Sequence, residues 1–432
     1  MEIINAFPGY EYKDGKNMFR GTDMGKGGYV YAEPGMYGNV ALLDVASMHP
    51  NSVINLNAFG EYTQHFKDLV MTRLYIKNKD YDSARKLFNG RLEPYLRDEE
   101  TSAALSQALK IAINSVYGLT SANFDNPFRD IRNKNNIVAL RGGLFMRTLQ
   151  DEVVKRGFKV AHIKTDSIKI PDATPEIIEF CMEFAKQYGY EFEHEATYDR
   201  MCLVNDAVYI AKYKDADECQ ELYGYIPGDN RKKGNKWTAT GTQFQIPYVF
   251  KKLFSKEEVI FEDLCETKSV TSALYLDMNE GLPDVAQLEK ELTKLMKTNP
   301  DNPNISILTD QIAAGHNYIF IGKVGSFCPI KPGRGGGLLC REKDGKYYSA
   351  TGAKGYRWLE AELVKSLEKY DDIDESHFIS MVNDAIDKIK EFGDYEWFVS
   401  GDPYIKPDLI PGEYGLYPFY EEDLPFVGPD NQ

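Results

Sequence analysis

Residues 40–45 read Val40-Ala41-Leu42-Leu43-Asp44-Val45, a short apolar run that contains one carboxylate. Such a run is typical of a strand that is buried on both faces. Further along the chain, residues 159–164 and 167–170 flank Thr165 and Asp166, and this pattern predicts a tight β-hairpin. Asp44 and Asp166 therefore each lie at the tip of an apolar strand, where one central sheet would bring them together.

Two carboxylates at strand ends are natural ligands for Mg²⁺, which prefers oxygen ligands and often binds through carboxylates and substrate phosphates. Two such ions about 3.5–4 Å apart activate an attacking hydroxyl and neutralise a leaving pyrophosphate. Either aspartate alone is explained more simply as a turn or cap residue. Together they predict a site for two Mg²⁺ ions, with Mn²⁺ as a substitute.

The segment between the two aspartates is helical in pattern, with a break near residues 89–94 that predicts a helical hairpin. Lys110, Asn114 and Tyr117 follow each other at i, i+4 and i+7, so they share one helix face. Arg73 and Lys77 repeat the i, i+4 spacing on the preceding helix. These cations could hold a triphosphate, with Arg giving forked hydrogen bonds and Lys giving point charges. The alternative for Arg73 and Lys77 is an ordinary solvated basic face.

Composition narrows the class of protein. The chain of 432 residues has a formal net charge of −15, which argues against coating nucleic acid through bulk positive charge and leaves room for a local basic groove. Its six cysteines form no CxxC pair, which indicates a reducing compartment. No apolar run approaches the ~18 residues of a membrane span. We therefore expect no membrane partner and a cytoplasmic location, in the host cytoplasm if the protein is viral.

Three ordered motifs resemble those of the family B DNA polymerases, and particularly those of bacteriophages. Residues 44–50 resemble motif A, residues 110–118 (Lys-x-x-x-Asn-Ser-x-Tyr-Gly) resemble motif B, and residues 164–167 resemble motif C. Lys26-Gly27-Gly28-Tyr29-Val30 is similar to the Gly-Gly element that precedes motif A in that family. The order and spacing of three motifs make this resemblance specific.

The resemblance implies an α+β fold of the right-hand polymerase type, with an antiparallel palm sheet, a helical fingers hairpin and a mainly helical thumb. It implies the following division: a first palm segment with motif A in residues 1–61, fingers with motif B in 62–118, a second palm segment with motif C in 119–250, and the thumb with an unassigned C-terminal region in 251–432.

The resemblance also implies roles for individual residues. The metal ligands would be Asp44, Asp166 and the carbonyl of Val45. The incoming nucleotide would be bound by two groups of residues: the cations Arg73, Lys77 and Lys110 with Asn114 and Tyr117, and the backbone amides of Ser47, Met48 and His49. Lys110 would also protonate the departing pyrophosphate. The primer-template DNA would contact Ser167, Tyr209, Lys212, Lys232, Lys233 and Gly241.

The chain departs from the family pattern at several positions. Position 49 is His where the family has Tyr, the residue that excludes a ribose 2′-hydroxyl. Lys164 replaces the first acid of motif C, and His162 replaces the aromatic residue before it. The lysine-rich element that touches the primer is reduced to Tyr209 and Lys212.

The 3′–5′ exonuclease domain of the family has no counterpart before motif A, so we expect a separate exonuclease or N-terminal subunit as a partner that docks near residues 1–30. Residues 98–100 (Asp-Glu-Glu) match an exonuclease spacing, but acids at the start of a helix are more simply explained as caps.

The expected function is template-directed, primer-dependent DNA synthesis from dNTPs. One alternative is a catalytically inactive relative that serves as a DNA-binding replisome scaffold. Another is a primase-like or RNA-making nucleotidyl transferase, which ribonucleotide use without a primer would reveal.

Overall fold

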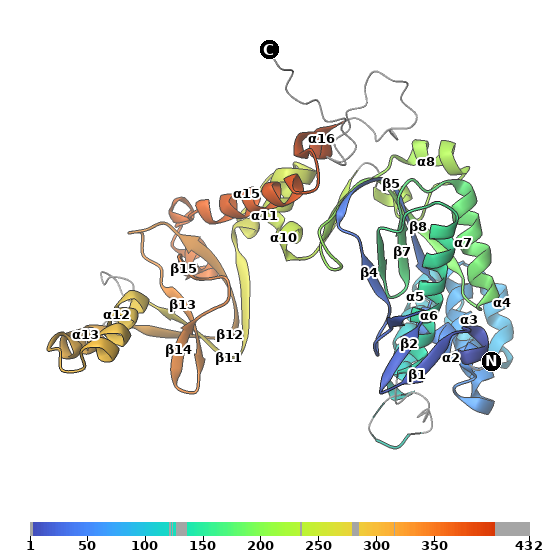
Figure 1. Ribbon diagram of the computed structural model, residues 1–432, viewed down its shortest axis with the longest axis horizontal. Helices are drawn as coiled ribbons and strands as arrows, with labels where there is room; N and C mark the ends of the chain where they lie inside the picture. The colour runs from blue at the N-terminus through green and yellow to red at the C-terminus, as the bar shows by residue number, and fades with distance from the viewer. Residues whose placement is uncertain are drawn as a thin grey trace, which may run out of the picture. The chain divides into compact units, whose positions relative to one another are not determined.

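The computed structural model describes residues 3–120, 122, 124–126, 136–233, 236–278, 285–314 and 316–401. The chain forms two compact units, one made of Met1–Gly241 with Ile389–Gln432 and the other made of Thr242–Lys388. Unit 2 is thus an insertion in the sequence of unit 1, and each unit has its own sheet and helices (Figure 1).

A seven-stranded antiparallel sheet forms the centre of unit 1, with strand order β10-β9-β8-β5-β7-β6-β4. Strand β5 (Gly35–Val45) lies between β8 (Phe192–Leu203) and β7 (Ser167–Ile170). The other strands are β4 (Val30–Ala32), β6 (His162–Lys164), β9 (Tyr209–Tyr213) and β10 (Trp237–Thr240). A separate three-stranded sheet holds β1 (Tyr10–Lys13), β2 (Lys16–Phe19) and β3 (Thr22–Asp23). The prediction of an antiparallel sheet around Asp44 is confirmed.

The two faces of this sheet have different surroundings because side chains alternate along a strand. Ala41, Leu43 and Val45 of β5 belong to the main core, which also includes residues of α6 (Ile137–Lys155) and α7 (Pro175–Gln187). Leu42 packs on the opposite face in a second cluster rich in tyrosine. Asp44 is two residues after Leu42 on the same strand, so its side chain lies on the same face of the sheet as Leu42, away from these two helices.

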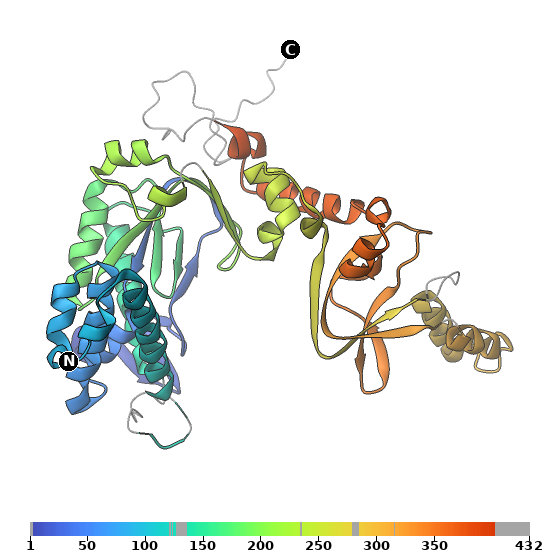
Figure 2. The same ribbon diagram turned by 180° about the vertical axis from the view of Figure 1, so that it is seen from behind.

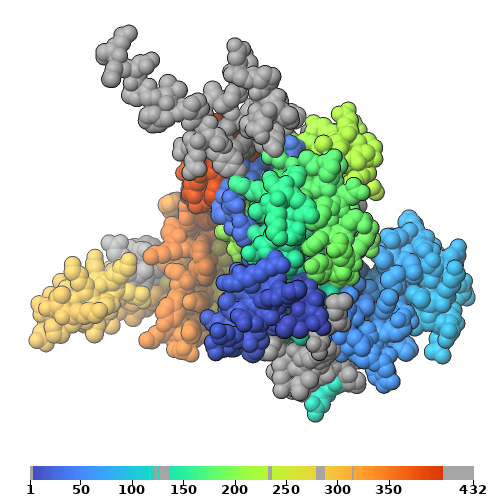
Figure 3. All heavy atoms as spheres, turned by 45° about the vertical axis from the view of Figure 1, so that its right-hand side comes forward, coloured from blue at the N-terminus to red at the C-terminus, as the bar shows by residue number. Residues whose placement is uncertain are grey.

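The expected helical hairpin lies beside this sheet. Helices α3 (Thr63–Lys77) and α5 (Glu99–Thr120) pack side by side in both ribbon views (Figures 1 and 2). The segment between them contains α4 (Tyr81–Lys86) and two 3₁₀ turns, Leu87–Gly90 and Glu93–Tyr95. The light-blue residues of α3 and α4 form a lobe that protrudes from the rest of unit 1 (Figure 3). Asp98 accepts a hydrogen bond from the Thr101 amide at 2.7 Å, which confirms the cap interpretation of residues 98–100.

The remaining helices of unit 1 are short. They are α1 (Ile3–Ala6), α2 (Met48–Leu56), the 3₁₀ turn Gly60–Tyr62, α8 (Ala216–Tyr223), α9 (Asn230–Lys233) and α16 (Tyr395–Ser400). None of the helices in the described parts of the chain is long and apolar enough to cross a membrane.

Unit 2 contains a five-stranded antiparallel sheet with strand order β14-β13-β11-β12-β15. Its strands are β11 (Glu266–Asp277), β12 (Tyr318–Ile330), β13 (Leu338–Lys343), β14 (Lys346–Ser349) and β15 (Arg357–Glu360). Its longer helices are α12 (Val285–Thr298), α13 (Asn304–Ala314) and α15 (Ser376–Lys390). Its shorter helical pieces are α10 (Thr242–Gln245), α11 (Pro247–Phe250), a π-turn at Lys251–Ser255, 3₁₀ turns at Phe261–Leu264 and Tyr370–Asp372, and α14 (Ala361–Ser366).

This sheet corrects the expectation of a mainly helical region after residue 250. Strands β11 and β12 bury apolar side chains such as Leu274 and Phe327 on one face, against Trp358. The first half of β11 alternates between partly buried and exposed residues, many of them Thr or Ser, which gives a weak apolar signal in the sequence. The boundary between the two compact units lies at 241/242, and residues 389–401 belong to unit 1.

Candidate active site

The structure places Asp44 and Asp166 on neighbouring strands. Asp44 of β5 is opposite Ser167 of β7, and the Val45 amide donates a hydrogen bond to the Asp166 carbonyl at 2.8 Å. Asp166 follows Thr165 in the two-residue turn between β6 and β7, where Lys164 pairs with Ser167. Two residues far apart in the sequence are thereby joined at one edge of the sheet.

The turn that carries Asp166 rests on the Gly-Gly element. The Thr165 amide donates a hydrogen bond to the Tyr29 carbonyl at 2.9 Å. A Cβ atom added to Gly28 would lie 2.7 Å from Cγ2 of Thr165, so a larger residue at position 28 would displace the turn. Thr165 itself has a φ of 59°, a conformation that non-glycine residues adopt only at some energetic cost.

Two further carboxylates lie at this site, and sequence reasoning missed both. Glu193 of β8 is opposite Asp44. The pairing of β5 with β8 shifts register between Leu42 and Leu43, which leaves Glu195 as an extra residue on β8. A bulge of this kind re-aims the side chains beside it. The i, i+2 spacing of the two glutamates was the available signal, but only the strand pairing shows that they face Asp44.

The accumulated negative charge changes the ionisation of Asp44. Burial is the largest cause, and the charges of Asp166, Glu195 and Glu193 add to it, so the pKa of the Asp44 carboxyl rises to about 7. The positive charge of Lys169 opposes this rise. A pKa near neutrality is typical of carboxylates at functional sites.

Lys169 is a buried cation beside these carboxylates. Its side chain is 3% exposed, and its Nζ lies 3.1 Å from Nδ1 of His162. Nε2 of His162 donates to the Asp206 carbonyl at 3.1 Å, so Nδ1 is free to accept from Lys169. Burial lowers the pKa of Lys169 to about 8, although the charges of Glu195 and Asp44 act in the opposite direction.

The donor set suits a hard divalent cation. Asp44 and Asp166 provide carboxylate oxygens on neighbouring strands, and the repulsion that raises the pKa of Asp44 would be relieved by a bound cation. Within the described ranges, no group of three or more His, Cys, Asp or Glu side chains is already arranged to hold a metal ion. The carboxylates thus fit Mg²⁺ by their chemistry, with the remaining ligands left to backbone, water and substrate.

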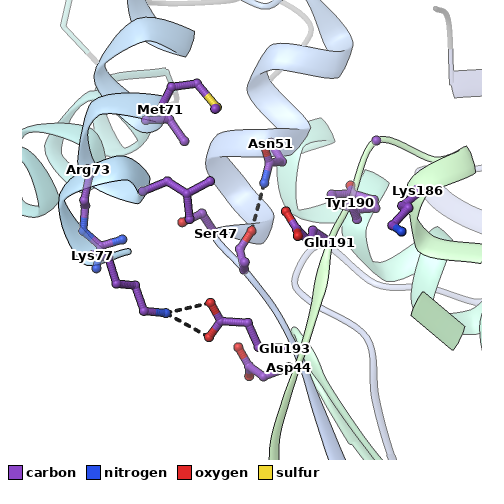
Figure 4. A pocket seen from close by; sticks show the side chains of 14 residues that line it. Asp44, Ser47, Asn51, Met71, Arg73, Lys77, Lys186, Tyr190, Glu191 and Glu193 are labelled. Carbon is purple, nitrogen blue, oxygen red and sulfur yellow. Dashed lines mark hydrogen bonds and ion pairs between the residues drawn. The ribbon is translucent and has the colours of Figure 1, made fainter. Parts of the chain in front are cut away.

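A cavity of about 530 Å³ opens on one side of Asp44 (Figure 4). Its lining includes Ser47, Arg73, Lys77 and Glu193. Nε of Arg73 is buried and has no hydrogen-bond partner within the described parts of the chain. Nζ of Lys77 donates to both carboxylate oxygens of Glu193 at 2.7 and 2.9 Å. Helix α2 begins directly after Ser47, and the first amides of a helix lack intrahelical acceptors, so they are suited to binding phosphate.

The other predicted nucleotide ligands lie near or outside this cavity. The His49 ring stacks on Tyr117 at 4.7 Å between centroids, and burial lowers the pKa of His49. Met48 is 3% exposed, so any nucleotide contact there would come from its backbone. Lys110 and Asn114 are exposed on α5 and do not line the cavity.

A second cavity of about 450 Å³ also borders Asp44. Its lining includes Asp44, Asp166, Ser167 and Tyr209. Lys212 is on β9 but does not line this cavity, and burial lowers its pKa.

The last predicted DNA contacts are at the end of the sheet. Gly241 has a φ of 84°, and a Cβ atom there would lie 2.6 Å from Cγ2 of Val208, so this tight approach requires glycine. The side chains of Lys232 and Lys233 lie outside the described region of the chain.

Comparison with known proteins gives a distant likeness. Neither a protein-family model nor a curated protein matches the sequence. Among solved structures, the chain is similar to the family B DNA polymerase from the hyperthermophilic archaeon Pyrobaculum calidifontis, with 13% sequence identity and a TM-score of 0.40. The similarity covers 94% of this chain and 50% of that polymerase, so the chain spans half the length of the protein that it matches.

Proposed function

We propose that the chain is the core of a family B DNA polymerase of the bacteriophage type, which adds deoxynucleotides to a primer 3′-hydroxyl opposite a template. The observation that carries the proposal is that two cavities share Asp44 in their lining, and that Asp166 lines the second of them. One cavity contains cations and the start of a helix, which suit a triphosphate. The other contains Ser167 and Tyr209, at positions where the family motifs contact the primer.

On the triphosphate side, Arg73 offers a guanidinium whose Nε has no protein partner. Lys77 is held by Glu193, and we infer that a nucleotide would compete with Glu193 for it. The free amides at the start of α2 would bind phosphate oxygens. Lys110, on the adjacent helix α5, would reach the nucleotide from the fingers and donate a proton to the departing pyrophosphate.

Asp44, Asp166 and the Val45 carbonyl would hold Mg²⁺. When bound, the ions supply Lewis-acid activation of the primer hydroxyl and neutralise charge on the leaving group. The protein's own residues position the reactants: the β6–β7 turn holds Asp166 beside β5, and Lys169 partly balances the carboxylate charge. Positioning and electrostatic stabilisation supply most of the rate in phosphoryl transfer.

The test is extension of a labelled primer on a template with Mg²⁺, using either deoxynucleotides or ribonucleotides. The wild type is compared with Asp166→Asn and with the matched control Asp217→Asn, an exposed acid in the first turn of α8. We expect template-directed addition of deoxynucleotides that is lost in Asp166→Asn and kept in Asp217→Asn.

The other outcomes contradict the proposal in distinguishable ways. DNA binding without extension by the wild type would favour the inactive scaffold. Synthesis from ribonucleotides without a primer would favour the primase-like alternative.

A further inference from the structure

Arg141 of α6 is a buried cation outside the site described above. Its side chain is 5% exposed, and its Nη2 donates to the Tyr188 carbonyl at 2.8 Å. The guanidinium lies over the ring of Tyr190 at 4.9 Å and over that of Phe7 at 6.0 Å. Its Nη1 is buried and has no hydrogen-bond partner among the described residues.

The charge of Arg141 has no anionic partner among the residues that the structure describes. A guanidinium stays protonated in proteins, so its charge cannot be removed by titration. Tyr190 does not supply an anion: burial raises the pKa of its hydroxyl, although the charge of Arg141 and side-chain hydrogen bonds with Ser52 and Arg141 act in the opposite direction. The hydrogen bond between this hydroxyl and Oγ of Ser52 measures 2.6 Å. Buried charges in proteins are normally paired, so this environment lacks a counter-ion.

A cavity of about 320 Å³ adjoins Arg141. Three carboxamides contribute to its wall and no acidic side chain does; the lining residues are Asn5, Ala6, Asn55, Arg141, Gln187, Tyr188 and Gly189. Asn55 is held in place, because its Nδ2 donates to the carbonyls of Asn51 at 2.7 Å and Gly189 at 3.1 Å. The space is several times the ~30 Å³ occupied by one water molecule.

Gly189 keeps this wall open. It has a φ of 74°, and a Cβ atom there would lie 2.2 Å from Oδ1 of Asn55. Gly189 also lines the cavity next to Asp44, so the two cavities are neighbours in unit 1 that share this backbone segment. They differ in charge: the one next to Asp44 contains carboxylates, and the one next to Arg141 contains none.

We propose that Arg141 and the surrounding carboxamides form a binding site for a compact oxyanion of the phosphate class. The guanidinium offers a planar fork of donors that pairs with two oxygens of an anion. The carboxamides of Asn5 and Gln187, on different elements, add further N–H donors to the wall of the cavity, and a tetrahedral anion has more oxygens to accept them than a carboxylate. The site is independent of the polymerase proposal, because it requires neither DNA nor a divalent metal.

The test is calorimetric titration of the full chain with inorganic phosphate, in EDTA and at constant ionic strength. The titration is done in the Arg73→Gln/Lys77→Gln background, so that the cations near Asp44 do not contribute. We expect one saturable site. Asn5→Trp, at an exposed position on the cavity rim, should weaken binding at least tenfold, whereas the control Ile4→Trp, at an exposed position outside the lining, should not. Arg141→Gln should abolish binding.

Three results would overturn the proposal. The first is the absence of saturable phosphate binding in the parent. The second is unchanged binding in Asn5→Trp, a variant that keeps Arg141 and so remains informative even if Arg141→Gln fails to fold. The third is acetate binding as tight as that of phosphate, which would exclude the phosphate class. A parallel titration with pyrophosphate is expected to give binding that Asn5→Trp also weakens.

Discussion

At the scale of single residues, Asp44 links the ionisation of the site to the stability of the fold. Its pKa is about 7 in the folded protein, against about 3.9 for an unperturbed aspartate. At a pH between these two pKa values, the Asp44 carboxyl keeps its proton in the folded state and has lost it in the unfolded state. The contribution of Asp44 to the free energy of unfolding therefore decreases as the pH rises from about 4 to about 7.

This linkage predicts the behaviour of Asp44→Asn. In metal-free buffer at pH 8 the variant should be more stable than the wild type by about 1–2 kcal/mol, a value reduced from the full shift because the carboxyl is partly exposed to solvent. At pH 4 the difference should vanish, since both side chains are then neutral. Urea unfolding in EDTA across this range measures it, and a variant less stable than the wild type at pH 8 would contradict the assignment. Primer extension should be lost.

The residue scale also shows how far the sequence could predict the site. Asp44 and Asp166 were identifiable because each ends an apolar run. Glu195 was not, because its position depends on a bulge in the pairing of two strands far apart in the sequence. Lys169 was likewise hidden, since a lysine within an apolar strand gives no sign of the carboxylates that surround it.

At the scale of elements, the contact between Gly28 and the β6–β7 turn can be tested with a matched pair of variants. Gly28→Ala should lower primer-extension activity at least tenfold, because its Cβ would meet Thr165 at 2.7 Å and displace the turn that carries Asp166. Gly27→Ala is the control, since no atom lies within 4 Å of a Cβ at that position. Equal activities of the two variants would show that the turn tolerates the shift.

The ion pair between α3 and β8 predicts a change in nucleotide affinity. Lys77 and Glu193 are each about half exposed, so their pairing contributes little to stability. Glu193→Gln should free Lys77 for the triphosphate and lower the KM for dNTPs about two- to fivefold, equivalent to less than about 1 kcal/mol. Steady-state primer extension measures this change.

Glu99→Gln serves as the control for that variant, because it breaks another exposed pair of the hairpin, with Lys79, away from the cavity. A fall in kcat or a rise in KM for Glu193→Gln would show that the glutamate itself takes part in the reaction.

Elements with a strong local pattern were predicted well. The helical hairpin and the β-hairpin around Asp166 both follow from periodicity and turn residues. The sheet of unit 2 was not predicted, because β11 pairs with β12 and β13 across a long segment that contains two helices; only the β13–β14 hairpin, with Asp344-Gly345 at its turn, had a local signal.

At the scale of the whole molecule, unit 1 depends on a segment that follows unit 2 in the sequence. Arg200 is 1% exposed and pairs with Asp199 at 2.7 Å. Its other nitrogens donate to the carbonyls of Trp397 at 2.8 Å and Gly401 at 3.0 Å. One buried guanidinium therefore joins β8 to the segment around α16.

Removal of this guanidinium should destabilise unit 1. Arg200→Met would remove the guanidinium from the buried Asp199 and from the carbonyls of Trp397 and Gly401, and we expect a loss of about 3–5 kcal/mol. Arg231→Met, at an exposed position, should change stability by less than about 0.5 kcal/mol. Chemical denaturation followed by far-UV circular dichroism compares the two, and an equally small effect of Arg200→Met would exclude a structural role for these contacts.

The Arg200 contacts can form only late in the synthesis of the chain. Arg200 and Gly401 are 201 residues apart along the chain. At about 5–20 residues per second, a ribosome needs about 10–40 s to make the intervening polypeptide. During that interval the nascent unit 1 has to keep Arg200 hydrated while all of unit 2 is made. A ribosome that stalls within unit 2 would therefore leave a product whose first unit is open at this position, and a protease would cut it more readily than the finished chain.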